Sequence, residues 1–202
     1  MDPKDLVRKG YDIVSERYRG DDGESPYPYE EYLTALRPLL SPGDAVVDLG
    51  CGCGLPIAGE LAADFDVTGV DLSPVQIERA QALVPEATFV CADMASVELP
   101  ADHFAAVVSF YALIHVPVEE HPAILRRTFG WLKPGGHLLA IVGARHLEYT
   151  AEDYLGAPMY WSHADAPTYR AWLREIGFDL VWDRFVPEGE GGHTLVLARR
   201  PA

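Results

Sequence analysis

Residues 45–56 place an apolar run directly before a cluster of glycines. Ala45-Val46-Val47-Asp48-Leu49 has the composition of a buried strand, and every second residue after it is a glycine up to Gly54. Glycine lets the backbone approach a ligand because no Cβ stands in the way, and the first N–H groups of a following helix lack partners. Pro56 suits the first position of such a helix. The segment therefore predicts a strand, a ligand-holding loop and a helix.

The spacing of the glycines separates two classes of nucleotide-binding loop. A dinucleotide oxidoreductase has Gly-x-Gly-x-x-Gly directly after the strand, but counting from Gly50 puts Leu55 at the third glycine position. The chain also has no Tyr-x-x-x-Lys pair. Both observations disfavour a nicotinamide enzyme. Asp71 ends the next apolar strand, where a carboxylate for ribose hydroxyls is expected.

The pattern Asp48-x-Gly50-x-Gly52-x-Gly54 resembles the first motif of class I S-adenosylmethionine (SAM)-dependent methyltransferases. Strands at 89–94 and 104–111 and the Lys-Pro-Gly-Gly turn at 133–136 follow in the order of that family. The resemblance covers residues 40–200 and is closest to small bacterial enzymes that act on small molecules. It implies an α/β, Rossmann-like fold with a seven-stranded, mostly parallel sheet, helices on both faces and an antiparallel C-terminal edge strand. The alternation of strands and helices supports the same architecture.

The resemblance also implies which residues contact SAM. Asp71 would accept hydrogen bonds from the ribose, and Asp93 would bind the adenine amino group. The other expected cofactor contacts are Asp48, Gly50, Cys51, Gly52, Leu72, Gln76, Met94 and Phe110. Simpler explanations exist for three of these side chains. Asp71 and Asp93 could be acids of a cap or turn, and Gln76 could be the capping partner of Ser73.

Two histidines are candidates for the acid–base chemistry. A hydroxyl or amine that accepts a methyl group loses a proton, and histidine titrates near neutrality. His115 follows the strand at 104–111 and is the first candidate for general base, with a structural or substrate-orienting role as the alternative. His163 is the second candidate, and its simpler role is to attach a lid to the domain. The expected substrate-side aromatic residues are Tyr11, Tyr18, Tyr111, Tyr160 and Trp161, whose rings suit a sulfonium or a flat acceptor but also suit packing.

The chain is expected to form a single domain over residues 1–202, with a helical cap at 1–40 and an irregular lid insertion at 143–165. Helices are predicted at 3–19, 29–40, 118–133 and 166–176, and from Pro56 and Pro74 onward. A glycine-rich turn at 187–192 should join two final strands. Pro74 follows Ser73 in a capping box, so that helix start is well marked.

The composition limits the partners. A net charge of −15 repels a phosphate backbone and disfavours nucleic acid. The N-terminus lacks the apolar core of a signal peptide, and no apolar run reaches the length of a membrane span, so we expect a cytoplasmic protein. Cys51 and Cys53 should fill a tight loop and Cys91 the core. His103, His121 and His137 are expected to be exposed.

The sequence predicts a SAM-dependent methyltransferase that moves a methyl group to oxygen or nitrogen of a small-molecule acceptor. The three cysteines do not have zinc spacing, and no second acid pair accompanies Asp93 or Tyr111, so no metal is expected. The alternative is a catalytically silent SAM-binding sensor or partner protein. The oligomeric state and the identity of the acceptor stay open.

Overall fold

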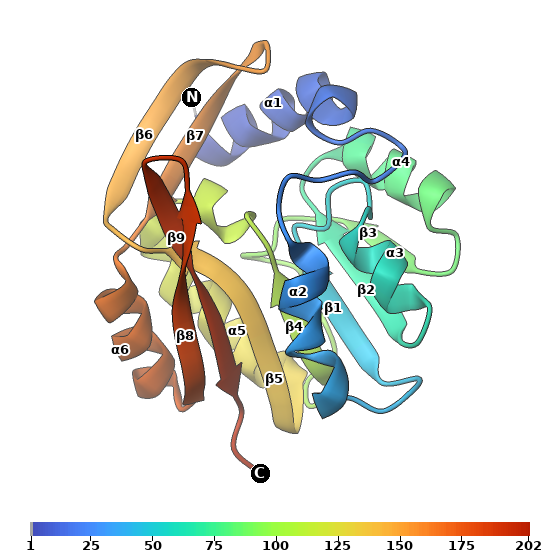
Figure 1. Ribbon diagram of the computed structural model, residues 1–202, viewed down its shortest axis with the longest axis vertical. Helices are drawn as coiled ribbons and strands as arrows, with labels where there is room; N and C mark the ends of the chain where they lie inside the picture. Colours follow the sequence, from blue (N-terminus) through green and yellow to red (C-terminus); the bar gives the residue numbers. More distant parts are fainter. Residues whose placement is uncertain (1) are drawn as a thin grey trace.

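The computed structural model describes residues 2–202 and has a central seven-stranded sheet with the strand order β3-β2-β1-β4-β5-β9-β8 (Figure 1). The strands are β1 (Ala45–Leu49), β2 (Asp66–Asp71), β3 (Thr88–Cys91), β4 (Phe104–Ser109), β5 (Leu132–Gly143), β8 (Asp179–Glu188) and β9 (Gly191–Arg199). The first five pair in parallel, and β9 is antiparallel to both of its neighbours. The predicted fold class is confirmed, with β9 as the antiparallel strand of the edge hairpin.

Helices cover both faces of the sheet and bury two separate apolar clusters against it. Side chains of α2 (Tyr29–Thr34) and α3 (Ile57–Ala62) pack on one face, and those of α5 (His121–Trp131) and α6 (Ala166–Ile176) pack on the other. The helix α4 (Pro74–Leu83) packs on β2 and β3. It begins as predicted, because the Ser73 side chain accepts a hydrogen bond from the Gln76 N–H.

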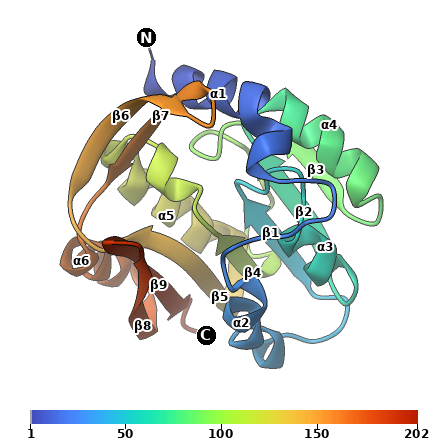
Figure 2. The ribbon, with the colours of Figure 1, turned by 45° about the horizontal axis from the view of Figure 1, so that its top comes forward.

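The helix α1 (Pro3–Tyr18) lies across the carboxyl ends of the parallel strands (Figures 1 and 2). A separate hairpin of β6 (Leu147–Tyr154) and β7 (Ala157–His163) packs against this helix. The segment predicted to be an irregular insertion is therefore a two-stranded hairpin. Its turn escaped prediction because Leu155 and Gly156 both take positive φ, and only Gly156 signals such a turn in the sequence.

Several predicted boundaries were wrong. The helix after the glycine loop begins at Ile57, with Pro56 as its N-cap. The segment predicted as one helix over 118–133 is a 3-10 turn, Val118–Glu120, followed by α5, and β5 already begins at Leu132. The segment after Tyr29 divides into α2 and a 3-10 turn, Arg37–Leu39, that contains Pro38.

Two burial predictions were also wrong. His121 is fully buried rather than exposed, because its Nε2 donates to the Val116 carbonyl at 2.9 Å and its Nδ1 lies 2.7 Å from the Tyr169 hydroxyl. Cys91 is exposed rather than part of the core, whereas Cys51 and Cys53 are buried as expected. Within residues 2–202, no helix has the length and apolar character that crossing a membrane requires.

Candidate functional site

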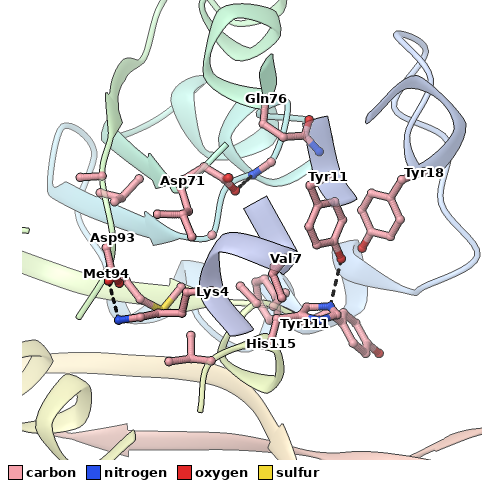
Figure 3. Close-up of a pocket in the computed structure, with 18 residues that line it drawn as sticks. Lys4, Val7, Tyr11, Tyr18, Asp71, Gln76, Asp93, Met94, Tyr111 and His115 are labelled. Atoms are coloured by element: carbon pink, nitrogen blue, oxygen red, sulfur yellow. Dashed lines mark hydrogen bonds and ion pairs between the residues drawn. The ribbon is translucent and has the colours of Figure 1, made fainter. Parts of the chain in front are cut away.

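A cleft lies between α1 and the carboxyl ends of the strands (Figure 3). One wall is the inner face of α1, and the other is formed by the loops that follow β1, β2, β3 and β4. Its lining residues are Lys4, Val7, Tyr11, Tyr18, Gly50, Gly52, Val70, Asp71, Leu72, Gln76, Ala92, Asp93, Met94, Phe110, Tyr111, Ala112, His115 and Val116. A second hollow shares Tyr18, Gly50, Gly52 and Phe110 with it and adds Asp48, Arg19 and Cys51.

All ten expected cofactor residues therefore line one of two adjoining hollows. Of the expected substrate-side residues, Tyr11, Tyr18 and Tyr111 line the cleft, and Tyr160 and Trp161 do not. His163 also lies outside it. Sequence reasoning missed Lys4 and Arg19, because a single basic residue in an amphipathic helix or just after it carries no motif.

The glycine loop forms the floor of the cleft. Gly50 has φ +77°, and its N–H donates to the Val70 carbonyl at 2.7 Å. A Cβ on Gly50 would collide with the Cβ of Ala112. Gly52 has φ +55° and faces open space, since no atom lies within 4 Å of the position of a Cβ. Gly50 is thus a glycine for packing reasons, and Gly52 leaves room for a ligand.

Asp71 is fixed by the backbone on both of its carboxylate oxygens. Its Oδ2 accepts a hydrogen bond from the Gly52 N–H at 2.9 Å, and its Oδ1 accepts one from the Ser73 N–H at 2.8 Å. Burial raises the pKa of this carboxyl, and the backbone hydrogen bonds oppose that rise. A carboxylate oxygen has two lone pairs, so each can still accept a ligand hydroxyl.

Asp93 has two partners of its own. Its Oδ1 accepts a hydrogen bond from the Ala95 N–H at 2.8 Å, and its Oδ2 lies 2.7 Å from Lys4 Nζ. The turn role weighed in the sequence therefore exists, since Asp93 caps the backbone at Ala95. The carboxylate nevertheless lines the cleft beside Met94 (Figure 3), so the turn role and a ligand role are compatible.

Asp48 is buried at 2% exposure, and its Oδ2 has no hydrogen-bond partner. Burial, with a smaller contribution from the charge of Asp71, raises the pKa of Asp48 to about 8. Arg19 lines the same hollow and is 5% exposed. Its Nη1 donates to the Glu24 carbonyl, and none of the ion pairs found within residues 2–202 includes it. An orphaned carboxyl and an unneutralised guanidinium in one hollow suit a ligand that carries both an ammonium and a carboxylate group.

His115 is held in a defined tautomer in the 3-10 turn Leu113–His115. Its Nδ1 lies 2.7 Å from the Tyr160 carbonyl, which can only accept, so Nδ1 carries the proton. Its Nε2 lies 3.0 Å from the Tyr11 hydroxyl, which therefore donates to it (Figure 3). Burial lowers the pKa of His115 to about 4, although the Tyr160 carbonyl acts against this. The imidazole is neutral at pH 7, with its lone pair directed toward Tyr11 at the cleft.

Of the remaining aromatic residues, Trp161 and Tyr160 contact His115, and Tyr111 contacts Tyr27. The Trp161 ring lies 5.2 Å from the His115 ring. Tyr160 contributes its carbonyl to His115 rather than its ring to the cleft, and its hydroxyl lies 3.2 Å from Glu148. Tyr111 has φ +57° and stacks on Tyr27 with ring centroids 4.1 Å apart. Such strain in a residue other than glycine is often found at functional sites.

His163 is 2% exposed, and its Nδ1 lies 2.7 Å from the Arg145 carbonyl. This contact joins the end of β7 to the segment after β5, which agrees with the simpler role for His163, that of attaching a lid to the domain. In the part of the chain that the structure describes, no three His, Cys, Asp or Glu side chains gather in a way that suits a metal ion.

Comparison with known proteins finds that the chain is similar to methyltransferases. Residues 46–136 match a family described as a methyltransferase domain. Phosphoethanolamine N-methyltransferase 3 of Arabidopsis thaliana is 34% identical over 153 residues, which are 70% of this chain and 30% of that protein. The chain thus spans about 30% of the length of this curated relative.

Solved structures extend the similarity over nearly the whole chain. An S-adenosylmethionine dependent methyltransferase from Mesorhizobium loti is 26% identical with a TM-score of 0.68, covering 90% of this chain and 100% of that one. Magnesium protoporphyrin IX methyltransferase from Synechocystis PCC 6803, solved with SAM bound, has a TM-score of 0.75 at 20% identity and covers 99% of this chain and 98% of that one.

Proposed function

Since the chain carries a methyltransferase domain on the class I, SAM-dependent fold, we propose that it binds SAM in the described cleft and transfers the methyl group to oxygen or nitrogen of a small molecule. The observation that carries the proposal is the match between the two hollows and the two ends of SAM. Asp71, a carboxylate held by two backbone N–H groups, lies in the first hollow. An orphaned carboxyl and an unneutralised guanidinium lie in the second.

Each part of the cofactor has a candidate partner. Asp71 would accept hydrogen bonds from the two ribose hydroxyls, and Asp93 would face the adenine amino group. Asp48 would face the ammonium group and Arg19 the carboxylate of the methionine portion, while Gly52 leaves space for the chain between them. Cys51 would contribute its backbone, because burial raises the pKa of its thiol far above the usual range.

The proposed chemistry needs a positioned acceptor and a destination for one proton. SAM, when bound, supplies an electrophilic methyl group. His115 would accept the proton of the acceptor hydroxyl or amine at Nε2 once the Tyr11 hydroxyl turns away. The Tyr160 carbonyl would keep the Nδ1 proton and stabilise the imidazolium that forms. Burial disfavours that charged form, so the proton should pass on to solvent after transfer.

The acceptor would lie in the part of the cleft that Tyr11, Tyr18, Tyr111 and His115 line. Rings at this place suit a cationic or flat group. The cover formed by α1 and the β6–β7 hairpin suits a small acceptor rather than a macromolecule, and the charge of −15 disfavours nucleic acid. Metal-independent transfer, a cytoplasmic location and a single domain stay predictions.

The experiment that tests this function separates binding from turnover. Isothermal titration with SAM tests the cleft, and S-adenosylhomocysteine (SAH) formation with a panel of phenols, amines and thiols tests the chemistry. His115→Ala should bind SAM like the parent but form SAH at least tenfold more slowly. An absence of SAM binding would refute the proposal. Tight binding without SAH formation from any acceptor would favour the silent sensor.

A further inference from the structure

The first turn of α1 is joined to the cleft by one ammonium group. Lys4 Nζ lies 2.7 Å from Asp93 Oδ2 and 2.7 Å from Glu120 Oε2. Burial disfavours the charge of Lys4, but the hydrogen bonds to the two carboxylates outweigh burial and raise its pKa. Lys4 is therefore charged at neutral pH. We call Lys4, Asp93 and Glu120 the Lys4 cluster.

The three members of this cluster differ in their relation to the cleft. Lys4 and Asp93 line it, and Glu120, which directly precedes α5, does not (Figure 3). Glu120 can thus reach a bound ligand only through the Lys4 ammonium. Their side chains are 20 to 31% exposed, so the ion pairs are partly shielded from solvent.

Other polar contacts join the later turns of α1 to α4. Ser73 Oγ donates to Asp12 at 2.6 Å, and Ser15 Oγ donates to Gln76 at 2.8 Å. These contacts lie on the Gln76 side of the cleft, whereas Lys4 lies on the Asp93 side. A nucleoside bound between α1 and the strand ends would therefore be covered by a helix that is attached on both sides.

We propose that Lys4 and Glu120 are positioning residues for the cofactor, holding the first turn of α1 closed over its adenine end. Glu120 fixes the Lys4 ammonium, Lys4 bridges to Asp93, and release of SAM or SAH requires this cluster to open. The inference rests on the proposed function, because it takes the ligand beside Asp93 to be adenine.

The test is the dissociation rate of SAH from the full chain, measured by stopped-flow displacement with excess SAM. Glu120→Gln should dissociate about two- to fivefold faster, as expected for one partly exposed ion pair. Lys4→Met removes both pairs and should dissociate about tenfold faster. The double variant should match Lys4→Met alone, because Glu120 acts only through Lys4.

Two further variants serve as controls. Lys4→Arg keeps the charge and both hydrogen bonds, so it should retain the slow dissociation. Lys9→Met removes a half-exposed ammonium that pairs with Asp5 within α1 and should dissociate like the parent. The melting temperature of the ligand-free protein is measured for every variant, since a merely structural role would lower it without changing the dissociation rate.

The outcomes also separate this inference from the proposed function. If the parent binds SAM and SAH but Glu120→Gln and Lys4→Met release SAH at the parental rate, the cluster has no positioning role while the function stands. Additive effects of the two substitutions would equally overturn the inference, because Glu120 would then act without Lys4. If the parent binds neither ligand, the proposed function itself fails.

Discussion

Replacing Asp71 with asparagine should weaken SAM binding by roughly 30- to 150-fold. The two ribose hydroxyls would each lose a charged acceptor, and hydrogen bonds to charged groups contribute about 1.5–3 kcal/mol each. Part of this is retained by the amide oxygen, so we take a net loss of about 2–3 kcal/mol, at about 1.4 kcal/mol per tenfold in affinity. Isothermal titration with SAM and with SAH measures the change directly.

The substitution also disturbs the loop, and the structure indicates by how much. The asparagine oxygen can accept from Gly52 or from Ser73, but its NH2 group then faces the other N–H. One unsatisfied backbone donor costs about 1–3 kcal/mol, which lowers the melting temperature of a chain of this size by several degrees. Thermal unfolding without ligand therefore separates the loss of stability from the loss of affinity.

Asp66→Asn is the matched control, because Asp66 is exposed at the opposite end of the same strand. It should leave SAM affinity and melting temperature near the parental values. The reasoning would be refuted if Asp71→Asn bound SAM within threefold of the parent while remaining folded. It would also be refuted if Asp66→Asn lost as much affinity, since charge alone would then explain the effect.

Three other predictions follow from the same structure. Gly52→Ala and Gly43→Ala place a Cβ in open space at φ +55° and +79°, so both should cost about 1 kcal/mol of stability, but only Gly52→Ala should weaken SAM binding in titrations. Asp48, with a pKa of about 8, should release close to one proton when an ammonium group binds at pH 7; calorimetry in buffers of different ionisation enthalpy detects this, and Asp48→Asn should abolish it. Burial lowers the pKa of His121 to about 4, from about 6.5 in the unfolded chain. The contribution of neutral His121 to the free energy of unfolding is therefore complete above pH 6.5 and is lost as the pH falls toward 4. Between pH 7 and pH 5, the free energy of unfolding of the parent should fall by about 2 kcal/mol more than that of His121→Gln, as measured by denaturant unfolding.

The fold and the gathering of the expected cofactor residues at one edge of the sheet could be predicted because both depend on local chain chemistry. Gly50 follows one apolar strand and Asp71 ends the next, and parallel strands bring their carboxyl ends to one edge of the sheet. The pairing of Gly52 N–H with Asp71 then follows from the register of β1 beside β2. Motif and position together were enough to predict that these residues gather in adjoining hollows, and their contacts with a cofactor stay predictions.

Other contacts in and around the cleft join segments far apart in the chain, and no local pattern encodes them. His115 was singled out as a base, but its tautomer is set by a carbonyl on β7, 45 residues away. Lys4 reaches Asp93 across 89 residues. His121 looked like an exposed residue at a helix start, and its burial depends on the Val116 carbonyl and on the Tyr169 hydroxyl, 48 residues away.

The contrast between His115 and Asp48 shows why burial cannot be inferred from residue type alone. Both are ionisable, and Asp48 lies near the end of β1 while His115 ends the 3-10 turn after β4. Desolvation drives both toward the neutral form, lowering one pKa to about 4 and raising the other to about 8. His115 has two hydrogen-bond partners for its neutral form, whereas one oxygen of Asp48 has none. The neutral imidazole of His115 is fully paired, so it can accept a proton only after the Tyr11 hydroxyl turns away. The unpaired carboxyl of Asp48 can meet a cation directly, so the two groups differ in what they would do when a ligand arrives.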